Sequence, residues 1–232
     1  PPARRPSPQV LAPAERRRAP DSVALALEVA GAAVAASGRQ AADLPCVFAS
    51  AHGDLAINDY MCSTLAVTPA QLSPIKFHNS VHNAAVGYWT IGTGCMQASN
   101  SLSGFDHSFA SALLEGAAQC AADAQAVLLV GFDAEAVGPL RQVHASEGLL
   151  AGGLVLSPER GERTVAAMDW SLAPGPAERA PLASQAARAL PPNAMGDLLP
   201  LFEALARLPD GPPTSLRMPL GSQLSLALRL SP

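Results

Sequence analysis

Hydrophobic and polar positions follow two different periods along the chain, which predicts a mixture of helices and strands. Residues 23–37 carry an Ala-rich apolar face between the capping residues Asp21 and Ser22 and the helix-ending Gly38. Residues 96–103 instead alternate with a period of two, with small side chains on one face. Two short apolar runs, 45–50 and 125–131, predict buried strands, and the second is continuous, as in a central strand covered on both faces.

The remaining elements are expected from similar patterns and complete an α/β chain. Helices are predicted at about 54–65, 79–92, 105–122 and 195–208, with a short helix or turn at 68–71. Strands 148–156 and 163–170 are expected to pair antiparallel across the turn 157–161, and two more strands lie at 215–218 and 222–230. Residues 173–192, rich in Pro and Ala, predict a loop or linker. We expect one domain over 21–232, preceded by a Pro/Arg-rich arm or linker at 1–20.

The composition favours a chain that covers one of its faces with a partner. Hydrophobic residues make up 49% of the 232 residues, whereas charged residues make up only 15%, which leaves little charge for the surface of a monomer. The net charge is −4, and the basic cluster Arg16, Arg17 and Arg18 lies in the Pro-rich arm. Binding to nucleic acid or to an anionic membrane is therefore not expected.

Cysteine usage and hydropathy point to a cytoplasmic protein. Cys46, Cys62, Cys95 and Cys120 show no C-x-x-C spacing and lie in or beside apolar runs, as expected of reduced thiols buried in a core. No apolar run is as long as a transmembrane helix, and no signal peptide is visible. No cofactor or metal is expected.

Residues 73–109 carry the most informative motifs. The run 73–83 reads SPIKFHNSVHN, followed by Gly87, Tyr88 and Trp89, the small-residue strand, and 101–109 with the letters SLSGFDHSF. This stretch resembles the part of a β-ketoacyl synthase in which a helix packs under a strand that leads to the nucleophilic cysteine. The resemblance is best over 45–135 and implies a thiolase-like fold with a reduced C-terminal half at about 148–232. In that family the cysteine opens a helix, where the helix dipole stabilises the thiolate.

The resemblance also shows which catalytic residues are missing. Counting forward from Ser73 places the nucleophile at Asp106, whereas counting back from residues 128–135 places it at His107, and neither is a cysteine. The family's first catalytic histidine has no candidate, because 158–192 contains no histidine. The second histidine belongs to an N-x-G-H turn, and residues 193–197 resemble that turn with Asp197 in the histidine's place. The resemblance therefore implies that the chain is not an enzyme by itself.

The family includes non-condensing chain length factors, which pair with an active ketosynthase and shape its acyl tunnel. Residues 16–18, the turn His52-Gly53-Asp54 and residues 73–83 look like a short subgroup associated with aryl polyene and xanthomonadin-type pigment clusters. The resemblance implies a ketosynthase partner, an indirect relation to acyl carrier protein, and polyketide or fatty-acid-type polyene synthesis. The implied interface and tunnel residues are Phe77, His78, His82, Asn83, Tyr88, Gln97, Ser99, Ser101, Phe105 and Phe109.

Other interpretations of the same residues stay open. His78 and His82 have the i, i+4 spacing of a metal pair, although hydrogen bonding that fixes the local helix explains them as well. Asp106, His107 and Ser108 are the residue types of a hydrolytic triad, but neighbours on one turn point in different directions. The alternative functions are an active acyl-transferring, condensing or hydrolysing enzyme of the same fold, and an unrelated α/β acyl-binding protein.

Overall fold

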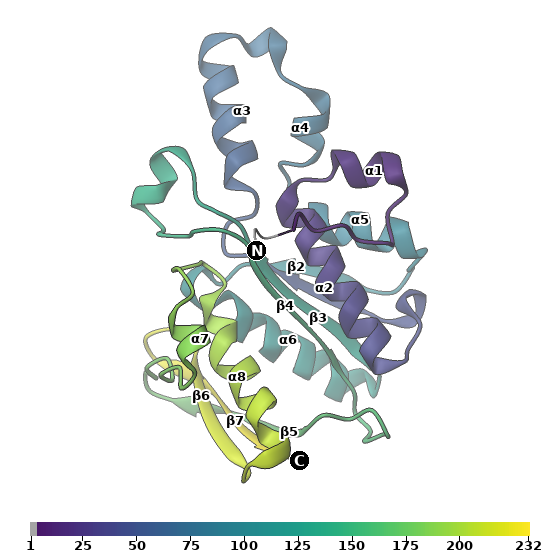
Figure 1. The fold of residues 1–232 in the computed structure, drawn as a ribbon, viewed down its shortest axis with the longest axis vertical. Coiled ribbons are helices and arrows are strands. Elements are labelled where there is room, and N and C mark those ends of the chain that lie inside the picture. Colours follow the sequence, from purple (N-terminus) through teal and green to yellow (C-terminus); the bar gives the residue numbers. More distant parts are fainter. Residues whose placement is uncertain (1–3) are drawn as a thin grey trace.

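A computed structural model describes residues 4–232 as two β-sheets with helices between and beside them (Figure 1). The first sheet has the strand order β2-β1-β3-β4, and the second has the order β5-β7-β6. β2 and β3 both run parallel to β1, β4 is antiparallel to β3, and the second sheet is antiparallel throughout. The strands are β1 (Cys46–Ala49), β2 (Ser99–Leu102), β3 (Val127–Asp133), β4 (Leu150–Leu156), β5 (Ala167–Pro174), β6 (Thr214–Pro219) and β7 (Leu224–Ser231).

The α-helices and 3-10 turns connect these strands and carry most of the residues predicted to matter. The helices are α1 (Pro13–Arg18), α2 (Asp21–Ser37), α3 (Leu55–Val67), α4 (Pro74–His78), α5 (Ala84–Thr93), α6 (Ser108–Asp123), α7 (Gln185–Arg188) and α8 (Leu199–Arg207). The 3-10 turns are η1 (Ala41–Asp43), η2 (Pro69–Gln71), η3 (Phe105–His107), η4 (Gly138–Gln142), η5 (Gly196–Leu198) and η6 (Leu208–Asp210).

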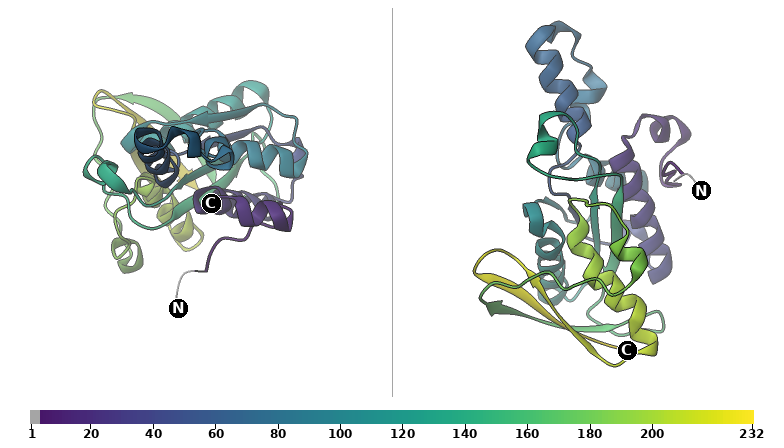
Figure 2. Two further views of the ribbon diagram at one scale, coloured as in Figure 1. Left: turned by 90° about the horizontal axis from the view of Figure 1, so that it is seen from above. Right: turned by 60° about the vertical axis from the view of Figure 1, so that its left-hand side comes forward.

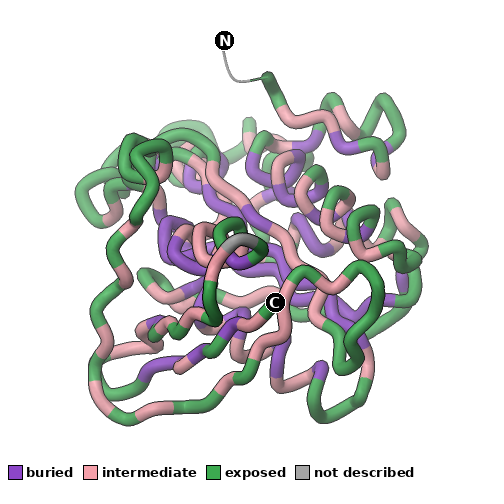
Figure 3. The backbone as a smooth tube through the Cα atoms, turned by 60° about the horizontal axis from the view of Figure 1, so that its bottom comes forward, coloured by how far each residue is buried: buried purple, intermediate pink, exposed green. Residues whose placement is uncertain are grey.

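The elements form four layers, with the first sheet between α2/α5 and α6 (Figure 2). One core lies on the α2/α5 side and contains Phe48 and Trp89. The other core joins α6 and α8 to the facing sides of both sheets. β3 is buried along its whole length, which confirms the prediction of a central strand covered on both faces. Figure 3 shows these buried strands at the centre of the molecule, surrounded by exposed loops.

Gly131 lets α6 and η5 approach the middle of β3. A Cβ atom at this position would lie 2.6 Å from Cδ2 of Phe109 and 2.9 Å from Sδ of Met195. Real Cβ atoms do not tolerate such distances, so the glycine sets how closely the start of α6 packs on the sheet.

The expected pairing of strands 148–156 and 163–170 is wrong. β4 joins the first sheet beside β3, whereas β5 joins the second sheet beside β7. The two strands do not form a local hairpin because each pairs with a different strand of the fold. Gly152 of β4 lies against the ring of Phe202, and Trp170 of β5 is paired with Leu228.

The helix predicted over 79–92 is shorter and begins at Ala84. α4 ends at His78, and the chain then turns, with Asn79 buried and the Ser80 hydroxyl donating to the carbonyl of Phe77. His78 and His82 therefore do not share one helical face, and the i, i+4 spacing does not make them a pair. The strand expected at 96–103 is also shorter and spans Ser99–Leu102. The helix expected at 105–122 begins only at Ser108, because Phe105–His107 form a separate 3-10 turn.

Part of the segment expected to be an extended arm packs on the domain. Leu11 and Ala19 are each 2% exposed and belong to the α2/α5 core. Val10 lies against Gly92 of α5, where a Cβ atom would be 3.1 Å from the Val10 carbonyl oxygen. Arg5 forms an ion pair with Asp21 at the start of α2.

The α3–α4 hairpin projects beyond the rest of the molecule (Figures 1 and 2). Only Leu55 and Ile57 of α3 are buried, and α4 has no buried residue. The hairpin exposes four large apolar side chains, namely Leu65, Val67, Ile75 and Phe77. No helix within residues 4–232 is both long enough and apolar enough to span a bilayer.

Candidate functional site

Polar side chains gather where the three parallel strands end. Ser50 and His52 follow β1, the η3 turn follows β2, and Asp133 is the last residue of β3. The carboxyl ends of parallel strands are where α/β proteins place their binding sites, because the loops there meet at one edge of the sheet. We refer to the group formed by Ser50, His52, His82, Asp106, Asp133 and His144 as the carboxyl-end cluster.

Asp133 is the buried centre of this cluster. Its side chain is fully buried, and it accepts hydrogen bonds from the Ser50 hydroxyl (2.5 Å) and from the Ala51 backbone N–H (2.8 Å). Burial raises the pKa of Asp133 to about 6, and the two hydrogen bonds oppose that rise. A carboxyl group of this kind changes its charge close to neutral pH.

Three imidazole rings surround this carboxyl group. Nδ1 of His52 lies 3.2 Å from the carbonyl oxygen of Gly53 and 3.7 Å from Oδ1 of Asp133. Burial lowers the pKa of His52. Nε2 of His82 lies 3.0 Å from the Ser50 carbonyl oxygen, so this nitrogen is the donor. The ring of His144 stands edge-on to that of His52, with centroids 5.5 Å apart.

Both candidate nucleophile positions lie in the η3 turn, directly before α6. Phe105 has a left-handed backbone with φ of 52°, which is strained for an aromatic residue. Oδ1 of Asp106 lies 3.4 Å from Nε2 of His144, and the Phe105 ring is 4.7 Å from the His144 ring. His107 is the residue immediately before the helix. The turn therefore presents a carboxylate and an imidazole directly before the start of α6.

The four thiols lie elsewhere. Cys46 is buried in β1, and burial together with Cys95 raises the pKa of its thiol to about 12. Cys120 is near the far end of α6, and Cys62 is exposed on α3. None of them is at the start of α6, where the helix dipole could stabilise a thiolate.

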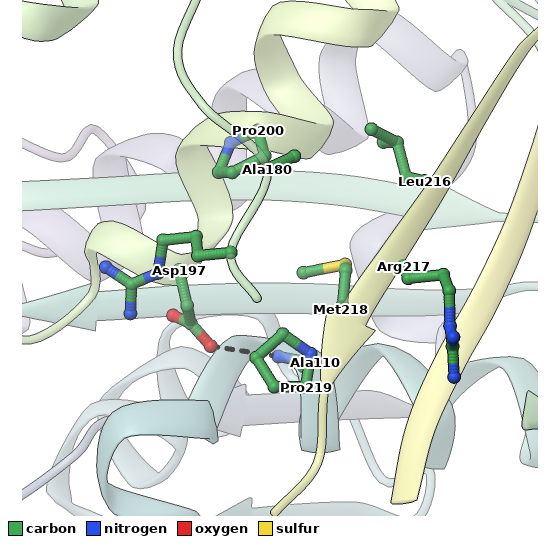
Figure 4. A pocket seen from close by; sticks show the side chains of 9 residues that line it. Ala110, Ala180, Asp197, Pro200, Leu216, Arg217, Met218 and Pro219 are labelled. Atoms are coloured by element: carbon green, nitrogen blue, oxygen red, sulfur yellow. Dashed lines mark hydrogen bonds between the residues drawn. The ribbon is translucent and has the colours of Figure 1, made fainter. Parts of the chain in front are cut away.

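Asp197 lies against the first turn of α6, close to the candidate nucleophile positions (Figure 4). Its Oδ2 accepts hydrogen bonds from the backbone N–H groups of Phe109 (2.9 Å) and Ala110 (3.1 Å). Burial raises the pKa of Asp197 to about 7, opposed by the two N–H groups and the Arg179 guanidinium. A small hollow beside it is lined by Ala110, Arg179, Ala180, Asp197, Pro200, Leu216, Arg217, Met218 and Pro219. Asp197 thus caps α6 from a distant part of the chain.

The residues predicted to form an interface or tunnel fall into three places. Phe77 and His78 are exposed on α4, while His82, Asn83 and Tyr88 lie in the following turn and on α5. The ring of Tyr88 is 6.0 Å from that of His78. Gln97, Ser99 and Ser101 lie in or just before the edge strand β2, and Phe105 is in η3. Phe109, by contrast, is fully buried in the core beside Phe202.

Asp133 and His144 were not identified as candidates from the sequence. Asp133 had a usable signal, because a carboxylate at the end of an otherwise apolar buried strand needs a partner. His144 lies in the irregular segment after β3, where no periodic pattern links it to Asp106. Across residues 4–232, no three His, Cys, Asp or Glu side chains are grouped so that they could hold a metal ion.

The layers and the position of the cluster define a thiolase-like fold of the ketosynthase type. Residues 2–195 match the family described as β-ketoacyl synthase, N-terminal domain, and the chain belongs to this family.

Solved structures with the same fold include complexes of two synthase-type chains. A chain of the ketosynthase ApeO in complex with its chain length factor ApeC from Xenorhabdus doucetiae is 22% identical, with a TM-score of 0.70 over 96% of this chain and 82% of that one. A chain of the ishigamide ketosynthase/chain length factor is 15% identical, with a TM-score of 0.72 over 97% and 84% of the two chains. A β-ketoacyl synthase from Burkholderia phymatum is 16% identical, with a TM-score of 0.56 over 85% and 57%. No curated protein sequence matches this chain.

Proposed function

We propose that the chain is a non-catalytic, chain length factor-like subunit that pairs with an active ketosynthase and shapes its acyl tunnel. The observation that carries this proposal is the start of α6. The side chain of Asp197 caps the N–H groups of its first turn, and the preceding turn carries Asp106 and His107 in place of a thiol. A condensing site needs a nucleophile there, and a structural subunit does not.

Two surfaces support pairing with another synthase-type chain. β2 is an edge strand with exposed Ser99 and Asn100, so its free edge can continue the sheet into a partner. Met96, just before it, is 94% exposed. The projecting α3–α4 hairpin carries Phe77 at 59% exposure, which suits insertion into a partner's surface.

The expected product class is a polyketide or fatty-acid-type polyene, made in the cytoplasm on acyl carrier protein. The support is the resemblance of residues 16–18, 52–54 and 73–83 to the aryl polyene and xanthomonadin-type subgroup. The ApeO/ApeC complex and the ishigamide complex share this chain's fold and consist of a ketosynthase and a chain length factor.

Co-expression with that ketosynthase and native mass spectrometry test the proposal. We expect a heterodimer, which Met96→Glu weakens because the charge is placed beside the β2 edge. Val165→Glu is the matched control, since Val165 is 65% exposed near the second sheet. If the wild-type proteins purify separately and this chain is a stable monomer, the proposal is wrong.

A second assay separates this proposal from an active enzyme of the same fold. The chain alone is incubated with malonyl- and acyl-loaded carrier protein, and products are followed by mass spectrometry. We expect no condensation, transfer or hydrolysis without the ketosynthase. Turnover by the chain alone that is lost in Asp106→Asn contradicts a purely structural role.

A further inference from the structure

Two buried imidazole nitrogens of the carboxyl-end cluster have no hydrogen-bond partner among the described residues. They are Nε2 of His52 and Nδ1 of His144, in side chains that are only 13% and 14% exposed. The two rings face each other edge-on, with centroids 5.5 Å apart. A buried polar atom without a partner costs about 1–3 kcal/mol, so two neighbouring cases in one site need an explanation.

Each ring is oriented by acceptors on its other nitrogen. Nδ1 of His52 faces the Gly53 carbonyl oxygen and, at 3.7 Å, Oδ1 of Asp133. Nε2 of His144 faces Oδ1 of Asp106 at 3.4 Å. Because carbonyl and carboxylate oxygens only accept, these nitrogens carry the protons, and the neutral rings keep their lone pairs on the two unpartnered atoms. The hollow beside Asp197 does not reach either ring.

We propose that His52 and His144 act as a pair that binds one added proton, and that this proton ties the loop after β3 to the turn that replaces the nucleophile. This inference does not depend on the proposed pairing with a ketosynthase. It concerns only groups within this chain.

The surrounding charges favour one proton and oppose a second. Asp133 faces His52 from β3, Asp54 faces it from the start of α3, and Asp106 faces His144 from η3, so carboxyl groups flank both rings. Burial raises the pKa of Asp133 to about 6, so this group favours the added proton only while it is ionised. Burial and the neighbouring His82 disfavour charge on His52. Arg179 donates a hydrogen bond to the Asp106 carbonyl oxygen from the 175–184 segment. Two coupled sites of this kind take up protons in separate steps.

Uptake of the first proton strengthens the contact between His144 and Asp106. That contact becomes a full ion pair, and the Phe105 ring already lies 4.7 Å from the His144 ring. Phe105 has a strained left-handed backbone conformation, so the η3 turn is energetically unfavourable by itself. An ion pair between His144 and Asp106 would stabilise this turn. Uptake of this proton should therefore hold the turn more firmly.

NMR titration of the imidazole nitrogens tests the pair. In the wild type, we expect the signals of His52 Nε2 and His144 Nδ1 to shift in a common first step. In His144→Gln, the midpoint of His52 should move by about half a pH unit or more, because its proton-sharing partner is lost. His78→Gln is the matched control, since His78 is exposed on α4 and should leave both signals unchanged. Independent titration of the two rings, with no change of one midpoint when the other ring is removed, overturns the proposal.

A substitution of the exposed Asp106 tests the proposal independently, in case His144→Gln does not fold. Asp106 is 58% exposed in its side chain, so Asp106→Asn should leave the fold intact. We expect this variant to lower the midpoint of the common step and to remove the pH dependence of amide exchange at residues 103–108. Exchange in the wild type that is equally fast at pH 5.5 and pH 8, after correction for the intrinsic rate, contradicts the tether.

Discussion

Oδ2 of Asp197 lies 2.9 Å from the backbone nitrogen of Phe109, a residue 88 positions earlier in the chain. The same oxygen accepts from Ala110, so one carboxyl group holds two N–H groups of the first turn of α6. These N–H groups have no partner within the helix, and the positive end of the helix dipole favours a carboxylate beside them. The contact joins the C-terminal half of the chain to the start of α6, directly after the η3 turn.

Replacing Asp197 should destabilise the protein. Asp197→Ala leaves two buried N–H groups without an acceptor, so we expect a loss of about 1–3 kcal/mol in the free energy of unfolding. Asp197→Asn keeps one acceptor oxygen and should lose less. Urea denaturation followed by circular dichroism measures both, with the exposed Asp169→Asn as control. An Asp197→Ala protein as stable as the wild type shows that the cap contributes little.

The stability of the wild type should fall as the pH rises through neutrality. Burial raises the pKa of Asp197 to about 7 and that of Asp133 to about 6, whereas an unfolded aspartate has a pKa of about 3.9. Because the folded state holds these protons more tightly, their stabilising contribution is complete below about pH 4 and is lost as the pH rises through 6 to 7.

Thermal melts between pH 5 and pH 8 measure this dependence. We expect a lower melting temperature at pH 8 than at pH 5, and a smaller difference in Asp197→Asn, which cannot ionise at that position. A melting temperature that rises from pH 5 to pH 8, unchanged in slope by Asp197→Asn, means that Asp197 is already ionised at pH 5.

Sequence patterns predicted the elements well where local periodicity and burial agree. The continuous apolar run that became β3 and the capped helix α2 are examples, since each needs only its own residues to specify it. The predicted pairing of β4 with β5 failed because Gly152 packs against Phe202 and Trp170 is paired with Leu228, and both partners are far away in the chain. Local spacing carries no information about such partners.

The candidate site was predictable only in part for the same reason. Asp106, His107 and Asp197 were predicted through a family resemblance; the first two lie in the turn before α6, and Asp197 contacts the first turn of that helix from η5. Their neighbour His144 comes from an irregular loop, so neither periodicity nor motif could reveal its contact with Asp106.

The two glycines Gly131 and Gly31 should respond to alanine in opposite directions. Gly131→Ala places a methyl group 2.6 Å from the Phe109 ring, and the resulting overpacking should cost about 1–3 kcal/mol. Gly31 lies in α2 with nothing within 4 Å of the position of an added Cβ, so Gly31→Ala should stabilise by about 0.5–1 kcal/mol. Denaturant melts of the two variants compare them directly. A neutral Gly131→Ala variant contradicts the close packing of α6 on β3.

Phe77 and Phe109 were both predicted to face an acyl tunnel, and their burial predicts that they behave differently. Phe109 is fully buried beside Phe202, so Phe109→Ala should cost about 3–5 kcal/mol and impair folding of the chain alone. Phe77 is 59% exposed on the projecting hairpin, so Phe77→Ala should change the free energy of unfolding by less than about 0.5 kcal/mol.

The effect of Phe77→Ala should appear only in the complex with a ketosynthase. If the hairpin contributes to the shared tunnel, removing the ring enlarges the space for the growing chain and shifts the products toward longer acyl groups. Product analysis of the reconstituted complex, with the exposed hairpin variant Val67→Ala as control, tests this. If Phe77→Ala changes neither the products nor the affinity for the ketosynthase, this side chain is not part of the interface. The β2 edge is then the remaining candidate surface, and Met96→Glu tests it independently.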